Sequence, residues 1–182
     1  GLENLLEVAR ELKYLKRNCI KILFIGEGAL KKSLIKSAKK YDLKNCIFID
    51  SMPKEELSKL LKESVHLGLM VLKNIPEFYD GTSPNKFFDY LACGLPIINN
   101  YPGWLAGIIK KYNCGIVVKP EDPIEFANAL IKLSKDELLV RELGENSYKI
   151  SKEKFSKKDS IKKFQKYVVD KYANFLRKKD SI

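Results

Sequence analysis

One segment of the sequence, EFYDGTSPNKFFDYLACGLPII, combines residue types that could hold a phosphorylated ligand. Ser83 is suited to cap a helix, and Pro84 is suited to its first position. The free amides of Asn85 and Lys86 would then point out of a helix N-terminus, which attracts anions such as phosphate. Asp89 follows about one turn, or roughly 6 Å, further along, where its carboxylate could accept hydrogen bonds from a ribose. Spacing alone favours this interpretation no more than an ordinary helix start with an exposed Asp89.

A second candidate is the turn Gly26-Glu27-Gly28, which follows the apolar run CIKILFI and precedes a helical stretch. Two glycines allow a ligand to approach the backbone closely, although many turns between a strand and a helix contain such a pair for steric reasons alone.

Cysteine and histidine offer little further chemistry. Cys19, Cys46, Cys93 and Cys114 are too far apart in sequence for a metal knuckle or a redox dithiol, so we expect free, mostly buried thiols in a reducing cytoplasm. A reactive thiol at Cys93 beside Gly94 is the alternative. His66 is the only histidine, and we expect it to be structural and no metal to be bound.

The elements that would position these residues alternate regularly. Apolar runs at residues 19–25, 45–50, 65–72, 95–100 and 114–119 predict strands, and helical patterns lie between them at 29–41, 53–64, 84–94 and 104–113. This order predicts an α/β fold, a Rossmann-like, doubly wound parallel sheet of about five or six strands followed by C-terminal helices. In such a sheet, ligands bind beyond the carboxyl ends of the strands, where both candidate segments lie.

The two ends of the chain differ in character. An uncapped amphipathic helix begins at residue 1, which we interpret as the start of a piece cut from a longer protein. We divide the chain into a ligand-binding domain (1–150) and a basic amphipathic helix (151–182) with Ile161, Phe164, Val168, Tyr172 and Phe175 on one stripe. That helix would pack on the domain or cross to another one.

The net charge of +11 does not point to nucleic acid. Of 34 basic residues only four are arginine, and residues 149–182 alone contribute +8. Recognition of nucleic-acid bases favours the planar, bidentate guanidinium group of arginine, whereas the lysine ammonium is suited to solvated surfaces. No apolar run is long enough to span a membrane, and we expect a cytoplasmic protein.

The segment SPNKFFDYLACGLPII resembles the donor-site helix of family 4 glycosyltransferases, whose GT-B fold joins two Rossmann-like domains. GLENLLEVARELK, ILFIGEGALKKSL, IFIDSMPKEELSKLL and CGIVVKPEDPIEFANAL resemble further segments of that family's C-terminal domain, in order, over about nine-tenths of the chain. The PNK form is most similar to the branch that builds surface polysaccharides with UDP-linked amino sugars, as L-fucosamine transferases do.

The resemblance implies roles for individual residues. Asp89 would take the place of the second Glu of the family's E-x7-E motif and bind the ribose. The amides of Asn85 and Lys86, beside Ser83 and Pro84, would hold the diphosphate. The remaining implied nucleotide contacts are Gly26, Glu27 and Gly28 beside the diphosphate and Ser51, Met52 and Pro53 facing the base. Eight residues before Asp89, however, stands Gly81 rather than Glu, so Asp80 or Glu77 would have to contact the donor sugar.

The implied function is transfer of a hexosamine-type sugar from UDP, with retention and without a metal, to a saccharide or lipid-linked acceptor in surface-polysaccharide synthesis. The N-terminal acceptor domain and the family's Arg and Lys that neutralise the diphosphate would precede residue 1. We therefore expect the isolated chain to bind UDP weakly and to transfer nothing. The last helix would cross to the absent domain, or else contact anionic lipid at the inner face of the membrane.

Three alternatives remain open at this stage. A UDP-sugar 2-epimerase shares the architecture, but its catalytic residues would include a histidine in addition to acids, and only His66 is present. A basic nucleic-acid-binding module would show salt-dependent binding of DNA that UDP does not alter. A regulatory domain could bind a nucleotide without catalysis.

Overall fold

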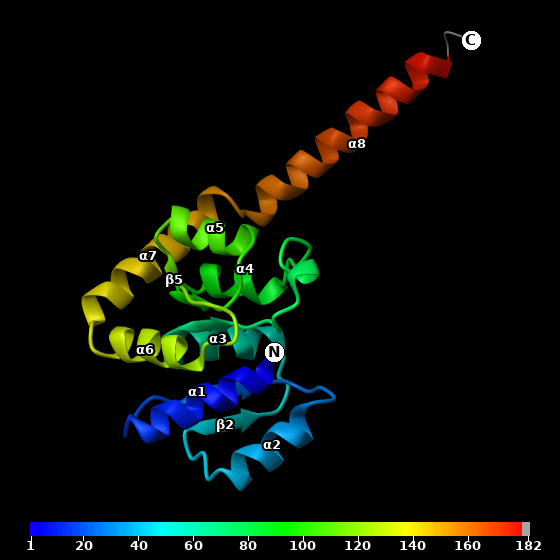
Figure 1. The fold of residues 1–182 in the computed structure, drawn as a ribbon. Coiled ribbons are helices and arrows are strands. Elements are labelled where there is room, and N and C mark those ends of the chain that lie inside the picture. The colour runs from blue at the N-terminus through cyan, green and yellow to red at the C-terminus, as the bar shows by residue number, and fades with distance from the viewer. Residues whose placement is uncertain (180–182) are drawn as a thin grey trace.

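The structure is a computed structural model that describes the backbone of residues 1–179 and the side chains of residues 1–172. Strands and helices alternate along the chain up to α6, and helices alone follow (Figure 1). The strands are β1 (Ile22–Ile25), β2 (Cys46–Ile49), β3 (Gly68–Met70), β4 (Ile97–Asn99) and β5 (Gly115–Val117). The helices are α1 (Leu2–Tyr14), α2 (Lys31–Lys40), α3 (Lys54–Ser64), α4 (Asn85–Ala92), α5 (Trp104–Lys111), α6 (Pro123–Ser134), α7 (Glu137–Glu153) and α8 (Lys157–Lys179), with a short 3₁₀ turn η1 (Pro76–Phe78).

Every described strand pair is parallel, and the α/β fold class is thereby confirmed. β1 pairs with β2 in the register Ile22 to Cys46. β4 lies between β3 and β5, with Ile97 opposite Gly68 on one side and Gly115 on the other. Parallel strands require a crossover connection, and the intervening helices α2, α3, α4 and α5 provide it.

The sheet itself differs from the expected single one, because it is divided between β1 and β3 into a two-stranded and a three-stranded part. In residues 1–179 no strand pairing joins the two parts. A cavity of about 910 Å³ lies there instead, and its walls include Leu23 of β1 and Leu69 of β3. The two parts are held together by helix packing, most extensively that of α1 on α6.

Two hydrophobic clusters form the core, and β4 contributes to both. Ile97 and Ile98 are each 0% exposed, yet Ile98 packs with α1 and α6 while Ile97 packs with α4 and α5. Neighbouring residues of a strand point to opposite faces of a sheet, which explains this division. The apolar run LPII is therefore the signature of a strand covered by helices on both sides.

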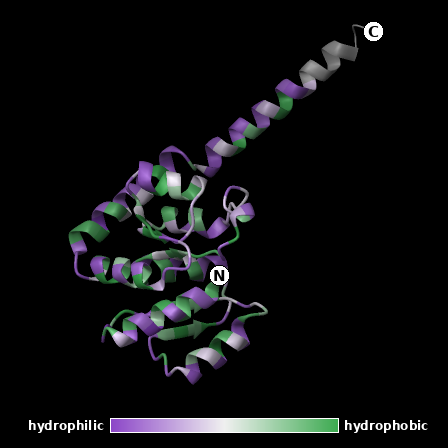
Figure 2. Ribbon diagram, in the orientation of Figure 1, coloured by the Kyte–Doolittle hydropathy of each residue, from purple (hydrophilic) through white to green (hydrophobic). Residues whose placement is uncertain are grey.

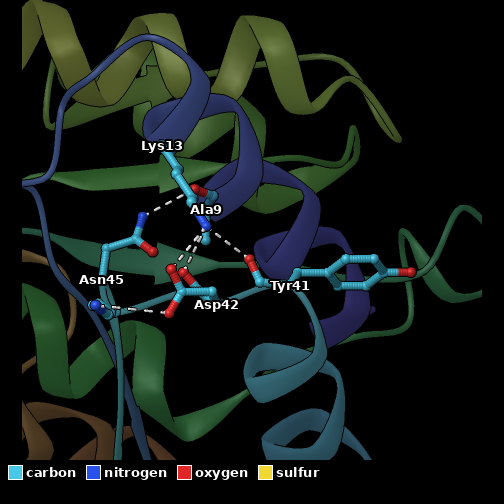
Figure 3. Close-up of polar contacts among 6 residues, drawn as sticks. Ala9, Lys13, Tyr41, Asp42 and Asn45 are labelled. Atoms are coloured by element: carbon cyan, nitrogen blue, oxygen red, sulfur yellow. Dashed lines mark hydrogen bonds and ion pairs between the residues drawn. The ribbon is translucent and has the colours of Figure 1, made fainter.

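Helix α1 is fastened to the segment after α2 by polar contacts (Figure 3). The Lys13 ammonium donates to the carbonyl oxygens of Tyr41 and Asp42, at 3.0 and 2.9 Å, and lies 3.2 Å from an Asp42 carboxylate oxygen. The Asn45 side-chain amide donates to the carbonyl oxygen of Ala9 at 2.9 Å. The two contacts join α1 to the turn that leads into β2.

Helix α8 extends away from the rest of the domain (Figure 1). Hydrophilic and hydrophobic residues alternate along it (Figure 2), and Ile161, Phe164, Val168 and Tyr172 of the predicted stripe are exposed. The side chain of Phe175 lies outside the described residues. Helix α7 continues to Glu153 and α8 begins at Lys157, while the division of the chain at residues 150 and 151 stays a prediction. Within residues 1–179, no helix is long and apolar enough to cross a membrane.

Candidate functional site

The N-terminus of α4 presents unpaired backbone donors. The helix begins at Asn85, and in the described residues no hydrogen bond involves the amides of Asn85 or Lys86. The first acceptor inside the turn is the carbonyl oxygen of Pro84, which receives the Phe87 amide at 3.0 Å. Two adjacent amides at a helix start therefore remain available for an anion.

The prediction that Ser83 caps α4 and that Pro84 is its first helical residue is wrong. Ser83 makes no capping hydrogen bond, and Pro84, with an extended backbone (φ −76°, ψ 132°), occupies the capping position instead of the first helical one. Proline has no side-chain acceptor, and among residues 1–172 no other side chain caps the amides that follow it. The change leaves the helix tip more open to a ligand than a serine cap would.

Aromatic packing fixes the position of α4. Phe87 is fully buried, and its ring centroid lies 6.2 Å from that of Trp104 on α5 and 6.4 Å from that of Phe155 after α7. The ring centroids of Phe88 and Phe155 are 5.3 Å apart. These edge-to-face contacts fix the first turn of α4 against α5 and against the segment after α7.

The far end of α4 rests against α7. Gly94 has φ +71° and turns the chain from α4 into β4. A Cβ at Gly144 of α7 would lie only 2.5 Å from the Gly94 carbonyl oxygen, so α7 approaches this turn more closely than any larger residue would allow. The positive φ thus explains Gly94, and the close packing of α7 on this turn explains Gly144.

The loop that leads into α4 is anchored by its aromatic residue. Tyr79 is buried, stacks on Tyr101, and donates its hydroxyl hydrogen to the Asn74 side chain. The Trp104 indole donates to the Thr82 carbonyl oxygen at 2.9 Å. Glu77 and Asp80, the candidate donor-sugar contacts, are both exposed in this loop near Gly81.

Lys86 connects the helix tip to the cavity between β1 and β3. Its side chain is partly exposed and lines the cavity together with Gly26, Glu27 and Gly28. Burial lowers the pKa of Lys86, and the described residues form no ion pair with it. A desolvated ammonium without an acidic partner is a favourable neighbour for a bound anion. Gly26 has φ +124°, which explains why this turn needs glycine.

A cluster of charged side chains that we did not predict contacts the turn Gly26-Glu27-Gly28. The Lys31 ammonium lies 2.6 Å from Glu27 and 2.5 Å from Asp50, which follows β2. Hydrogen bonding to Asp50 and then to Glu27 raises the pKa of Lys31, and the bond from Lys31 lowers the pKa of Asp50. The i,i+4 spacing of Glu27 and Lys31 signals half of this cluster, but nothing local in the sequence indicates Asp50.

Asp89 lies one turn along α4, and its side chain is 34% exposed. Its carboxylate Oδ1 is 3.1 Å from the Nζ of Lys54, the first residue of α3, whose side chain is 80% exposed. Lys54 directly follows the predicted base-facing segment, of which Ser51 and Pro53 are exposed and Met52 is partly exposed. The structure thus brings Asp89 to the segment after β2, although Lys54 itself was missed.

The thiols and the histidine differ in part from expectation. All four cysteines are free, but Cys19 is exposed, because it lies in a turn before β1, and only Cys114 is fully buried. Burial raises the pKa of Cys46 and of Cys114 to about 11. His66 is exposed and lies two residues before β3.

The arrangement combines two free amides, a desolvated ammonium, a glycine turn and a partly exposed carboxylate. Amides and an ammonium can stabilise phosphate charge, and a carboxylate can accept hydrogen bonds from hydroxyl groups. The aromatic packing and the turn at Gly94 hold these groups in place before a ligand arrives. Chemically, this is a site for a phosphorylated molecule that also carries hydroxyl groups.

Known proteins that are similar to this chain are glycosyltransferases. A family model described as glycosyl transferases group 1 matches residues 1–150. The uncharacterized glycosyltransferase MJ1069 of Methanocaldococcus jannaschii is 28% identical over 171 residues, which are 91% of this chain and 41% of the relative.

Solved structures share the fold. TarM of S. aureus, solved with fondaparinux, an α-GlcNAc-glycerol and UDP, matches with a TM-score of 0.76 and 21% identity over 91% of this chain and 32% of that one. HepE of Anabaena, solved with UDP, matches with a TM-score of 0.68 and 13% identity over 83% of this chain and 41% of that one. The chain thus spans less than half the length of each of these proteins.

Proposed function

This chain belongs to the glycosyl transferases group 1 family, and we propose on that basis that it forms the part of such an enzyme that binds the nucleotide-sugar donor. The observation that carries the proposal is the geometry of α4. Two free amides lie at its tip, and Asp89 lies one turn further along. A diphosphate at the tip would leave the attached ribose within reach of that carboxylate.

Each remaining part of the site has a role in this proposal. Asn85 and Lys86 bind the diphosphate through their amides, with Ser83 and Pro84 shaping the approach to the helix. Gly26, Glu27 and Gly28 border the diphosphate from the neighbouring strand end. Ser51, Met52 and Pro53 face the base. Glu77 or Asp80, both exposed in the loop before α4, contacts the donor sugar where Gly81 cannot.

The donor in this proposal is a UDP-linked hexosamine, and the sugar passes with retention to a saccharide or lipid-linked acceptor in surface-polysaccharide synthesis, as in the L-fucosamine-transferase-like branch. Departure of UDP leaves negative charge on the diphosphate, which the amides and the Lys86 ammonium stabilise. No metal is needed for that step. TarM and HepE were each solved with UDP, which supports UDP as the nucleotide.

The acceptor in this proposal is held by a separate N-terminal domain, so the chain by itself binds UDP weakly and transfers nothing. α8 would contact that domain, and its exposed apolar residues and excess of lysine also suit a negatively charged membrane face. The whole enzyme would work in the cytoplasm, at or near that face.

Calorimetry with UDP tests the proposal directly. Millimolar UDP should give a saturable heat, and Asp89→Asn should weaken binding about tenfold, because losing the charge of one hydrogen-bonding group costs about 1.5 kcal/mol. Glu63→Gln removes an exposed acid from α3 and serves as the matched control, with unchanged affinity expected. Absence of heat at millimolar UDP, or equal binding by the Asp89 variant, would refute the proposal.

A further inference from the structure

The ion pair between Lys54 and Asp89 covers the carboxylate to which the proposed function assigns the ribose. Lys54 Nζ lies 3.1 Å from Asp89 Oδ1, and no other side chain among residues 1–172 makes a polar contact with the Asp89 carboxylate. The pair links the start of α3 to the exposed side of α4. Lys54 therefore places a cation where, in the proposed function, a nucleotide would place hydroxyl groups.

A ribose and Lys54 cannot use the carboxylate equally well at the same time. Two neighbouring hydroxyl groups are best accepted by the two oxygens of one carboxylate, whereas Lys54 engages Oδ1. Each carboxylate oxygen can accept more than one hydrogen bond, but the Asp89 side chain is only 34% exposed, so we expect the ribose to displace the ammonium from Oδ1.

The Lys54 side chain is free to leave. It is 80% exposed, and its departure needs rotation of its own carbon chain only. The backbone beneath it stays in place, because the Leu57 amide donates to the Pro53 carbonyl oxygen at 3.0 Å and so completes the first turn of α3. Exposed ion pairs are weak enough to open readily, with a strength that corresponds to a factor of about 1.5 to 5 in an equilibrium constant.

We propose that Lys54 is a specificity-determining residue that competes with the nucleotide for Asp89. This inference rests on the proposed function, since it takes Asp89 as the ribose acceptor. A nucleotide that offers both ribose hydroxyls displaces Lys54 and recovers the lost contact. A nucleotide without them leaves the ion pair closed and gains nothing from the carboxylate.

The test is a double-mutant cycle on this chain, read by calorimetry with UDP. Lys54→Met keeps the length of the side chain and removes the charge, so UDP should bind about 1.5 to 5 times more tightly than to the unsubstituted chain. In an Asp89→Asn background, Lys54→Met should change the affinity little. The same gain should also disappear when 2′,3′-dideoxy-UDP replaces UDP.

Lys59→Met is the matched control. Lys59 is exposed on the same helix, and no ion pair with it occurs in the described part of the chain. Its removal measures what losing one positive charge does to the binding of an anionic ligand, which is expected to be a slight weakening. If Lys54→Met tightens UDP binding while Lys59→Met weakens it slightly, the tighter binding is evidence for competition, because the loss of a positive charge alone would weaken the binding of an anion.

The outcomes are separable. If UDP binds to the unsubstituted chain and Lys54→Met leaves the affinity unchanged, the competition is refuted while the proposed function stands. Weaker binding by Lys54→Met would make Lys54 a direct ligand of the nucleotide and would also overturn the competition. A gain that persists in the Asp89→Asn background would show that Lys54 acts through another group. If UDP does not bind to the unsubstituted chain, the proposed function fails and the inference falls with it.

Discussion

Two glycines in helix interiors should respond to alanine with opposite signs. Gly144 of α7 is buried, and a Cβ there would lie 2.5 Å from the Gly94 carbonyl oxygen. Gly107 of α5 is exposed, and a Cβ there would meet no atom within 4 Å. Helix propensity favours alanine by up to about 1 kcal/mol at both positions, so only the local contact distinguishes them.

The structure sets the size of the difference. Ordinary contact with a Cβ begins near 3.4 Å, so α7 must move away from the Gly94 turn by about 0.9 Å, and the obstructing atom belongs to the backbone. Overpacking of this kind costs about 1–3 kcal/mol, and the upper part of that range applies because no side chain can rotate away. After the gain in propensity, Gly144→Ala should lower the free energy of unfolding by about 1–2 kcal/mol. Gly107→Ala should raise it by about 0.5–1 kcal/mol.

Urea unfolding followed by circular dichroism measures both variants, and the midpoints should move in opposite directions at an unchanged slope. Because α7 supports the turn at the end of α4, Gly144→Ala should also weaken UDP binding, whereas Gly107→Ala should not. A Gly144→Ala protein as stable as the unsubstituted chain would refute the close approach of α7 to the Gly94 turn.

Three further predictions concern charge and exposure. Burial lowers the pKa of Lys86, so its charge is lost below the ordinary value of 10.5. UDP affinity, measured by calorimetry, should fall as the pH rises from neutrality toward that value, and Lys86→Arg should abolish the fall, because arginine stays protonated. Lys31→Met should be less stable in thermal unfolding at neutral pH. The deficit should shrink as the pH falls through the lowered pKa of Asp50, where its carboxylate is protonated, and also as the pH rises through the raised pKa of Lys31. Finally, a thiol reagent should modify Cys19 in the native protein, while Cys114, whose pKa burial raises to about 11, should react only after unfolding, as peptide mass spectrometry would show.

Local sequence patterns predicted the helices and strands well, because each pattern depends only on residues that are close together in the sequence. The five apolar runs contain the five observed strands, and the start of α5 at Trp104 agrees with expectation. Pro84 shows the limit of such reasoning. A proline fits either the capping position or the first turn, and the sequence does not distinguish a start at Pro84 from one at Asn85.

Contacts between distant segments could not be predicted in this way. The gap between β1 and β3 depends on how helices from both ends of the chain pack, and no residue of either strand signals it. Lys54 and Asp89 are 35 positions apart, and only the folded chain shows that they meet. The roles of the predicted site residues stay predictions, whereas the fold class and the family are established.

Phe155 marks where the part of the chain that supports the site comes to an end. Its ring packs against α4, whereas α8 begins two residues further on, and none of its side chains up to residue 172 joins this aromatic packing. A shortened protein ending at Ser156 would therefore keep every group discussed for nucleotide binding. By its sequence it would also lose a net six of the eleven excess positive charges. Such a truncation should adhere less to polyanions during purification, which makes it the cleaner starting point for crystallisation with a nucleotide.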